Sequence, residues 1–260
     1  MPLREFRIGP IGEELYPRWV AELAARLDDP ALDRNVVVRD ELARLYLGRS
    51  VDFERELGDS SAPGAIRLLL ASLDPRNATL EAEYYKELDL EKWKRVKPLL
   101  WFWQMFDHSP VGRNVRLGTQ LRYMLAQRVF KKCGTGVRIF HEVEFSFGYN
   151  MTVGNGVTIH RNVLIDDRAE VILGNDVSVS DYANIYSHSH AVEDIHDVAL
   201  KKTIIEDRAR ITYHAVILAG VHVEKDAIVG SMGVASKKVE AGWIVGGIPA
   251  KLIAQKSVKP

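Results

Sequence analysis

Residues 203–230, TIIEDRARITYHAVILAGVHVEKDAIVG, carry the pattern that decides the fold. A large aliphatic residue recurs at every sixth position, and the residue two places before it is mostly small or aliphatic. The large residues are Ile205, Ile211, Ile217, Val223 and Val229. Two inward positions separated by one outward position are typical of a short strand. The period of six therefore predicts short strands joined by turns and stacked as a coil.

The same spacing extends upstream of this stretch. Val153, Ile159 and Ile165 are six apart, and a second series follows after a slip of two residues. That series is Leu173, Val179 and Ile185. Turn-forming Gly, Asn and Asp residues follow several of these positions and tolerate the dihedral angles of a sharp corner. The pattern predicts a parallel β-helix of triangular section, with about five coils stacked roughly 4.8 Å apart.

The first half of the chain has a helical period instead. Leu15, Trp19, Leu23 and Leu27 form one apolar stripe, which predicts an amphipathic helix. Weaker helical patterns cover 40–47, 64–73 and 79–87. A further helical segment runs from 89 to the proline at 98, where it is expected to end. The last helix of this half is expected to have Gly134 as its C-cap. We therefore expect an α+β protein with a mostly helical domain at 1–132, and a β-helix domain with a C-terminal capping segment at 133–260.

Composition excludes several classes of protein. The 260 residues are 47% hydrophobic, and 35 basic side chains balance 35 acidic ones, so no charge field attracts nucleic acid. The single cysteine, Cys133, cannot form an internal disulfide or a cysteine-based zinc site. No run of 18 apolar residues is present, which predicts no membrane span. The first residues lack the apolar segment of a signal peptide, and we expect a cytoplasmic protein.

The period of six fails over 186–202, YSHSHAVEDIHDVALKK, which predicts a loop ejected from the coil. The loop contains His188, His190 and His196, and loops on rigid scaffolds often carry function. One imidazole could act as a general base near its ordinary pKa of about 6.5. Two or three could instead share a zinc ion, or all could be solvated surface histidines. Spacing alone leaves these three interpretations open.

At this point the chain resembles the hexapeptide-repeat acyltransferases with a left-handed parallel β-helix. It is most similar to the branch of galactoside and maltose O-acetyltransferases and related sugar and xenobiotic acetyltransferases. The resemblance rests on the hexads, on Ser189 and His190 where the loop leaves the coil, and on the segments VGSMGVASKK (229–238) and GGIPAK (246–251). It implies an acetyl-CoA-dependent O-acetyltransferase, a homotrimer with sites between subunits, and direct transfer to a carbohydrate-like hydroxyl, with no acyl-enzyme and no metal.

The resemblance also assigns residues. His190 matches the family's catalytic base. The positions that match the path of acetyl-CoA are Ser236, Lys237, Lys251 and Lys256, and a lysine ammonium suits a phosphate as a point charge. The positions expected on the acceptor side are His188, Asn162, Asp166 and Asp167. Asn162, Asp166 and Asp167 are equally suited to corners of the coil.

Two features depart from the family. Tyr213 stands at a coil position where relatives often keep small residues for the cofactor, and the helical half is much longer than the short cap of the sugar O-acetyltransferases. Two other functions therefore stay open. One is a zinc lyase of the γ-carbonic-anhydrase type, with zinc bound between subunits by His160, His190 and His196, and the other is a non-catalytic trimeric binding scaffold.

Overall fold

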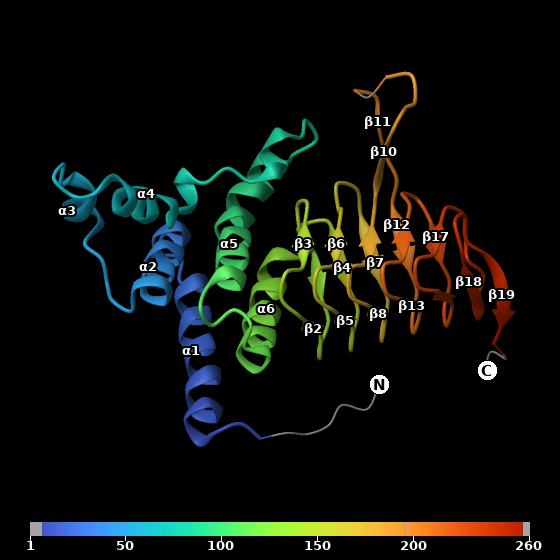
Figure 1. Cartoon of the computed structure of the whole chain (residues 1–260), viewed down its shortest axis with the longest axis horizontal. Helices are drawn as coiled ribbons and strands as arrows, with labels where there is room; N and C mark the ends of the chain where they lie inside the picture. Colours follow the sequence, from blue (N-terminus) through green and yellow to red (C-terminus); the bar gives the residue numbers. More distant parts are fainter. Residues whose placement is uncertain (1–6, 195, 257–260) are drawn as a thin grey trace.

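The computed structural model describes residues 7–194 and 196–256. Residue 195 of the predicted loop and the outermost residues of both predicted domains, 1–6 and 257–260, lie outside the described residues. The first half of the chain is helical and stands at one end of a prism of strands (Figure 1). The helices are α1 (Pro10–Asp28), α2 (Arg34–Leu47), α3 (Phe53–Gly58), α4 (Gly64–Ser72), α5 (Leu90–His108) and α6 (Val115–Val129), with 3-10 turns η1 (Pro75–Asn77) and η2 (Glu81–Tyr84).

The strands form the three faces of the prism, and the chain visits the faces in the same order in each coil. Face A contains β1 (Lys132–Cys133), β4 (Met151–Val153), β7 (Val171–Leu173), β12 (Thr203–Ile205) and β15 (His222–Val223). Face B contains β2 (Arg138–Ile139), β5 (Thr158–Ile159), β8 (Ser178–Val179), β13 (Arg210–Ile211), β16 (Ile228–Val229), β18 (Trp243–Gly246) and β19 (Lys251–Gln255). Face C contains β3 (Glu144–Phe145), β6 (Leu164–Ile165), β9 (Asn184–Ile185), β14 (Val216–Ile217) and β17 (Val234–Ala235).

Neighbouring strands on each face are parallel, except that β19 returns antiparallel along β18. Because β19 covers the edge of β18, the last coil is capped by the chain's own C-terminal segment. The predicted α+β fold with a left-handed parallel β-helix and a C-terminal cap is confirmed. The boundary between two separate domains stays a prediction.

The large hexad residues fill the prism. Ile205, Ile211, Ile217, Val223 and Val229 each have 0% exposure. Full burial of such a side chain contributes about 1.5–3 kcal/mol. The stacked aliphatic residues therefore explain both the period of six and the rigidity of the corners that carry the polar side chains.

The coils stack too closely for a side chain at some corners. A Cβ atom added to Gly134 would lie 2.5 Å from the carbonyl carbon of Gly154 in the next coil. Gly134 therefore serves coil stacking, and its predicted role as a helix C-cap is wrong, because α6 already ends at Val129. The corner between faces B and C has left-handed residues in every coil, namely Glu142, Asn162, Tyr182, His214 and Met232.

Two helical predictions need correction. The pattern over 79–87 forms only the single turn η2, in which the Glu83 side chain accepts from the backbone N–H of Leu80 at 2.9 Å and its other oxygen pairs with Lys97 at 2.9 Å. Pro98 lies inside α5 instead of ending a helix. Its missing N–H removes one backbone bond, but the flanking Val96 and Leu99 are fully buried, and this packing holds the helix together.

The helical half packs directly on the first coil. Trp103 of α5 meets Phe145 of β3 edge-on, with ring centroids 5.4 Å apart. Beside it, the buried guanidinium of Arg122 donates to the buried carboxylate of Asp107, with Nε 2.8 Å from Oδ1. Within the described residues, no helix is both long and apolar enough to cross a membrane.

Candidate active site

One corner of the prism, between faces C and A, gathers most of the predicted polar residues. Each coil turns here immediately after its face C strand, and the backbone N–H groups of Ser146, Asp166, Tyr186 and Leu218 each bond to the next coil. Ser236 follows the last of these strands, β17, at the same corner. The coils therefore stack Ser146, Asp166, Tyr186, Leu218 and Ser236 in one column.

The predicted loop leaves the prism at this corner as a two-stranded hairpin (Figure 1). Its strands are β10 (His188–His190) and β11 (Val198–Leu200), paired antiparallel. The chain leaves after Tyr186 and returns at Thr203, where the Thr203 hydroxyl donates to the Tyr186 carbonyl at 2.7 Å. Both ends of the hairpin are thus tied to the third coil, which fixes where β10 begins.

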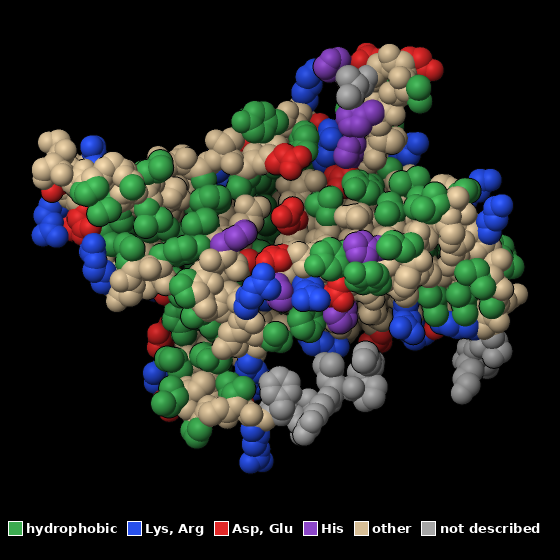
Figure 2. Space-filling model, viewed as in Figure 1, with side chains coloured by type: hydrophobic (Ala, Val, Ile, Leu, Met, Phe, Trp, Pro, Cys, Tyr) green, Lys and Arg blue, Asp and Glu red, His purple; other side chains and the backbone are tan. Residues whose placement is uncertain are grey.

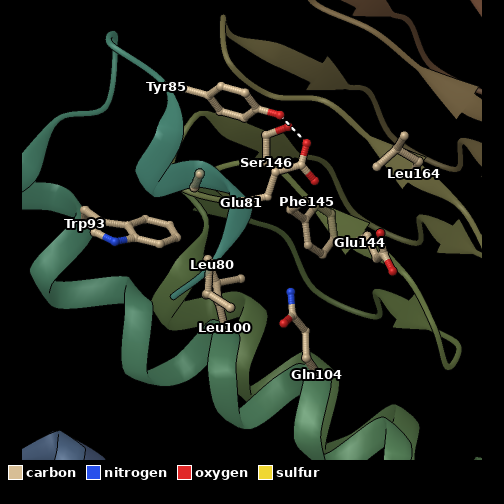
Figure 3. Close-up of a pocket in the computed structure, with 11 residues that line it drawn as sticks. Leu80, Glu81, Tyr85, Trp93, Leu100, Gln104, Glu144, Phe145, Ser146 and Leu164 are labelled. Carbon is tan, nitrogen blue, oxygen red and sulfur yellow. Dashed lines mark hydrogen bonds between the residues drawn. The ribbon is translucent and has the colours of Figure 1, made fainter. Parts of the chain in front are cut away.

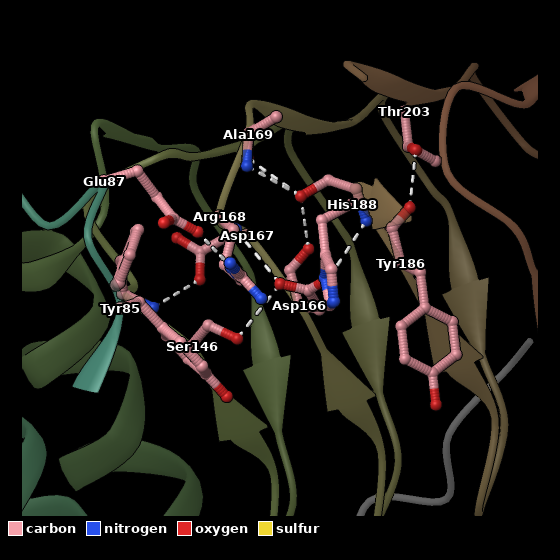
Figure 4. Close-up of polar contacts among 12 residues, drawn as sticks. Tyr85, Glu87, Ser146, Asp166, Asp167, Arg168, Ala169, Tyr186, His188 and Thr203 are labelled. Carbon is pink, nitrogen blue, oxygen red and sulfur yellow. Dashed lines mark hydrogen bonds and ion pairs between the residues drawn. The ribbon is translucent and has the colours of Figure 1, made fainter. Parts of the chain in front are cut away.

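The base of this hairpin contains an imidazole held by a buried carboxylate (Figure 4). Nδ1 of His188 bonds to Oδ2 of Asp166, whose residue is only 3% exposed. An ionised carboxylate can only accept, so we place the proton on Nδ1. This tautomer leaves the lone pair on Nε2 of His188.

The Asp166 carboxylate is itself fixed by other donors. The Ser146 hydroxyl donates to Oδ1 at 3.1 Å, and the backbone N–H of Arg168 donates to the same oxygen at 3.2 Å. The backbone N–H of Ser187 donates to Oδ2 at 3.3 Å. Four donors, including His188, therefore hold one carboxylate in place at the base of the hairpin.

His190 lies beside this pair. The rings of His188 and His190 are 5.1 Å apart and nearly perpendicular, at 89°. His190 is exposed, whereas His188 is half-buried. The structure therefore brings together an oriented inner imidazole and an accessible outer one.

Asp167, predicted on the acceptor side, points into the protein instead. It is fully buried, and its carboxylate accepts from the backbone N–H groups of Phe147, Gly148 and Asn150 at 2.7, 2.9 and 3.1 Å. Burial raises the pKa of the Asp167 carboxyl to about 6, although these N–H groups act in the opposite direction. Because Asp167 is occupied by the backbone of the previous coil, we do not carry it into the proposed site.

Asn162 lies at a different corner from Asp166, at the opposite end of β6. Its side-chain amide donates to Glu142 at 2.7 Å. It lines a hollow of about 310 Å³ between α5 and face C, together with Trp103, Gln104 and Glu144. The sequence placed Asn162 and Asp166 on one coil, and the structure separates them by the width of face C.

A second hollow, of about 60 Å³, continues this groove toward Asp166 (Figure 3). It shares Gln104 and Glu144 with the first and adds Glu81, Tyr85 and Ser146. Figure 3 shows the Gln104 amide pointing up into it from α5. Because the two hollows share lining residues, they form one groove. Ser146 lines this groove and bonds to Asp166, so the groove ends beside the carboxylate that holds His188. Figure 2 shows acidic side chains along this seam.

The residues predicted along the acetyl-CoA path fall in two places. Ser236 and Lys237 are exposed at the same corner as Asp166, two coils beyond the hairpin. Lys251 begins β19 on face B, and the Lys256 ammonium donates to the Asp226 carbonyl at 2.9 Å. The structure therefore brings only Ser236 and Lys237 into line with the imidazoles. Tyr213 lies at the corner of faces B and C, 6.0 Å from the ring of Tyr182, and so away from the corner of Ser236.

Sequence reasoning missed the residues that tie the helical half to this corner. Arg168 pairs with Glu87 and covers the ring of Tyr85, with its guanidinium carbon 4.1 Å from the ring centroid. It also missed Ser146, although a spacing of 20 separates Ser146, Asp166 and Tyr186. That spacing, one coil of three hexads plus the two-residue slip, would have placed the three in one column.

Within a single chain the histidines of the zinc hypothesis do not form one cluster, and a zinc site shared between subunits stays a prediction. His160 stacks on Phe140 at 5.1 Å at the corner of faces B and C, away from the hairpin that carries His190 and His196. Among residues 7–194 and 196–256, no three His, Cys, Asp or Glu side chains are placed to hold a metal ion.

Several known proteins with a similar sequence or structure are acetyltransferases. The chain is 50% identical over 54 residues to a 2,3,4,5-tetrahydropyridine-2,6-dicarboxylate N-acetyltransferase of Staphylococcus aureus, a match that covers 21% of this chain and only 23% of that protein. No family model matches the chain.

Solved structures extend the likeness to most of the molecule. A maltose O-acetyltransferase from Clostridium difficile superimposes with a TM-score of 0.57 at 16% identity, over 65% of this chain and 88% of that one. A hexapeptide-repeat acetyltransferase from Vibrio cholerae gives 0.55 at 22% identity, over 68% and 94%. A galactoside acetyltransferase in complex with coenzyme A gives 0.50 at 20% identity, over 64% and 81%. The chain thus has the β-helix fold of the hexapeptide-repeat acetyltransferases.

Proposed function

We propose that this protein transfers an acetyl group from acetyl-CoA to a hydroxyl of a carbohydrate-like acceptor. The observation that carries the proposal is the pair of imidazoles at one corner, with His188 held by the buried Asp166 at the end of an acidic groove. Two of the similar solved structures contain acetyl-CoA or coenzyme A. Ser236 and Lys237, at the same corner, would hold the donor, because an exposed ammonium suits a phosphate.

His190 would serve as the general base. In this mechanism its neutral imidazole removes the proton of the acceptor hydroxyl as the oxygen attacks the thioester carbonyl. The tetrahedral intermediate collapses, the C–S bond breaks, and the imidazolium returns the proton to the departing thiolate. His188, fixed by Asp166, would position His190 and the acceptor without exchanging the proton itself.

The groove between α5 and face C favours an acceptor without negative charge. Neither of its two hollows is lined by any Lys or Arg among the described residues, while Glu81, Glu142 and Glu144 line it. Arg113, outside the lining, pairs with Glu142 at 3.0 Å, so Glu81 and Glu144 are the carboxylates that contribute most of the negative charge. Hydroxyl groups can donate to these carboxylates, whereas an anionic acceptor would be repelled. The dicarboxylate in the name of the Staphylococcus aureus relative would find no lysine or arginine among the described lining residues. This supports a neutral, hydroxyl-rich acceptor.

Release of coenzyme A, measured across sugars, nucleotide sugars, amino acids and antibiotics, tests the activity. With an active acceptor, His190→Ala should lower kcat by about 10²- to 10⁴-fold, the usual contribution of a general base, while its melting temperature stays that of the wild type. His196→Ala, in the same hairpin, is the matched control and should keep its activity. If His190→Ala remains active, the base is a different group, and His188→Gln then tests the inner imidazole.

Donor binding is tested separately. A ligand that binds only the folded state at 100 times its Kd stabilises it by about 2.7 kcal/mol. Acetyl-CoA should therefore raise the melting temperature, and no shift would favour the scaffold hypothesis. The homotrimer also stays a proposal, which sedimentation analysis of the purified protein decides.

A further inference from the structure

A third hollow, where the helical half meets the prism, has the opposite charge to the groove. Its volume is about 490 Å³, more than ten times the roughly 30 Å³ that a water molecule occupies in the liquid. Five cationic side chains line it, and no Asp or Glu is among the lining residues. The cations are Arg34, Lys92, Arg95, Arg128 and Lys131. We call this hollow the basic cavity.

Four separate segments of the chain build the basic cavity. Arg34 is the first residue of α2, Lys92 and Arg95 lie near the start of α5, and Arg128 lies in the last turn of α6. The remaining wall comes from the neutral polar side chains of Gln127, Tyr149 and Asn150, together with Phe130. Residues distant in sequence thus converge on one hollow, which distinguishes it from a run of charged residues along one exposed helix.

Carboxylates outside the lining neutralise three of the five cations. Lys92 pairs with Asp89 at 3.0 Å, and Nε of Arg128 donates to Asp28 at 2.8 Å. Lys131 pairs with Glu170 at 2.6 Å, and Glu170 also accepts Lys202 at 3.1 Å.

Arg34 and Arg95 take part in none of the ion pairs among the described residues, although the charge of Arg34 still acts on the Asp28 carboxylate. Arg34 donates to two backbone carbonyls, that of Leu27 at 3.0 Å and that of Arg95 at 3.4 Å, which orients the guanidinium without neutralising it. Arg95 forms no ion pair with any carboxylate of the described residues. Arg34 is half-buried and Arg95 is exposed, and both line the same hollow as three further cations with no Asp or Glu in the lining, an arrangement that suits an anionic ligand.

We propose that the basic cavity binds a small molecule that carries phosphate groups. A guanidinium presents paired N–H donors that match two phosphate oxygens, and lysines add point charges. The hollow is large enough for a diphosphate, and the amides of Gln127 and Asn150 offer neutral donors. The phosphate could belong to coenzyme A or to an independent phosphorylated compound, and the test separates these two sources.

Titration calorimetry of the full chain with inorganic pyrophosphate tests the proposal. We expect saturable binding by the wild type and at least a tenfold loss of affinity in the double variant Arg34→Gln and Arg95→Gln. Lys94→Gln, on the exposed part of α5 next to the cavity, is the matched control and should bind like the wild type. Absence of pyrophosphate binding, or equal affinity in the double variant, would overturn the proposal.

Coenzyme A, titrated into the same proteins, identifies the source of the phosphate. If its affinity falls with that for pyrophosphate, the cavity holds the diphosphate of the donor. If its affinity is unchanged, the cavity binds an independent compound. Circular dichroism of the double variant checks that it is folded, and Arg34→Lys with Arg95→Lys should restore part of the pyrophosphate binding because the charge is kept.

Discussion

The acidic groove and the basic cavity lie on either side of α5 and differ in how their charges are held. In the groove, Asp107 is locked by the buried Arg122, while Glu144 forms no ion pair with any described residue. In the basic cavity, three cations are paired near the surface and two guanidinium groups are not. Successive helix residues are about 100° apart, so Trp93, Leu100 and Gln104 face the groove while Lys92 and Arg95 face the cavity. One helix therefore separates two sites of opposite charge preference.

The largest effect should come from breaking the buried pair under the groove. Arg122→Leu leaves Asp107 buried without its cation, and we expect the free energy of unfolding to fall by about 3–5 kcal/mol. Arg128→Leu, which removes a pair exposed to solvent through Asp28, should cost about 1 kcal/mol or less. Urea denaturation of both variants measures the two losses in the free energy of unfolding. Equal losses would show that burial of the Arg122–Asp107 pair does not make it more important for stability than the exposed Arg128–Asp28 pair.

The next effect concerns the inner imidazole where the groove ends. Asp166→Asn removes the negative charge and replaces one carboxylate oxygen by an NH2 group, which cannot accept from Nδ1 of His188. Because Ser146 and Arg168 both donate to Oδ1, the amide oxygen should take that place and the NH2 group should face His188. We expect acceptor kcat/KM to fall about 10- to 100-fold, the range for an oriented histidine at metal sites that loses its carboxylate. A shifted pH profile of kcat/KM would distinguish this from a merely structural effect. Asp181→Asn, at the corner of faces B and C, serves as the control. An unchanged rate in Asp166→Asn would remove His188 from the mechanism.

The smallest effect should be a change in acceptor choice. Glucose and glucose 6-phosphate differ only by the phosphate, and the wild type should prefer the acceptor without it. Glu144→Gln removes one unpaired carboxylate of the groove and should reduce this preference by about five- to tenfold. Glu14→Gln, on the exposed face of α1, should leave it unchanged. A wild type that prefers the phosphate would mean that the acceptor enters through the basic cavity.

The repeating half was predictable from the sequence because its signal is repeated. Ile211 and its counterparts in the other coils all occupy the same inward position, so one residue that departs from the pattern does not hide the period of six. The helical half offered no such repetition, and Pro98 was expected to end a helix that the packing of Val96 and Leu99 continues.

The sequence was sufficient to name residues of the candidate site, but not to predict which of them bond to one another. His188, His190 and Asp166 were all singled out, but the bond between His188 and Asp166 depends on the direction in which the hairpin leaves the corner. The neighbouring sequence does not indicate that Asp167 is buried, because the backbone of the previous coil surrounds its carboxylate. It does not indicate the basic cavity either, because four distant segments of the chain build that cavity.

The hairpin of β10 and β11 interrupts the period of six in the sequence but not the stacking of the coils. Asn184 and Ile185 of β9 pair with Val216 and Ile217 of β14 in the same register that joins the earlier coils. The segment between Tyr186 and Thr203 is therefore an appendage that the stacking of the coils does not require. Changes in the length or composition of this appendage could accumulate over evolution without disturbing the column beneath it, so that new acceptors can be recruited while the framework that holds the donor stays the same.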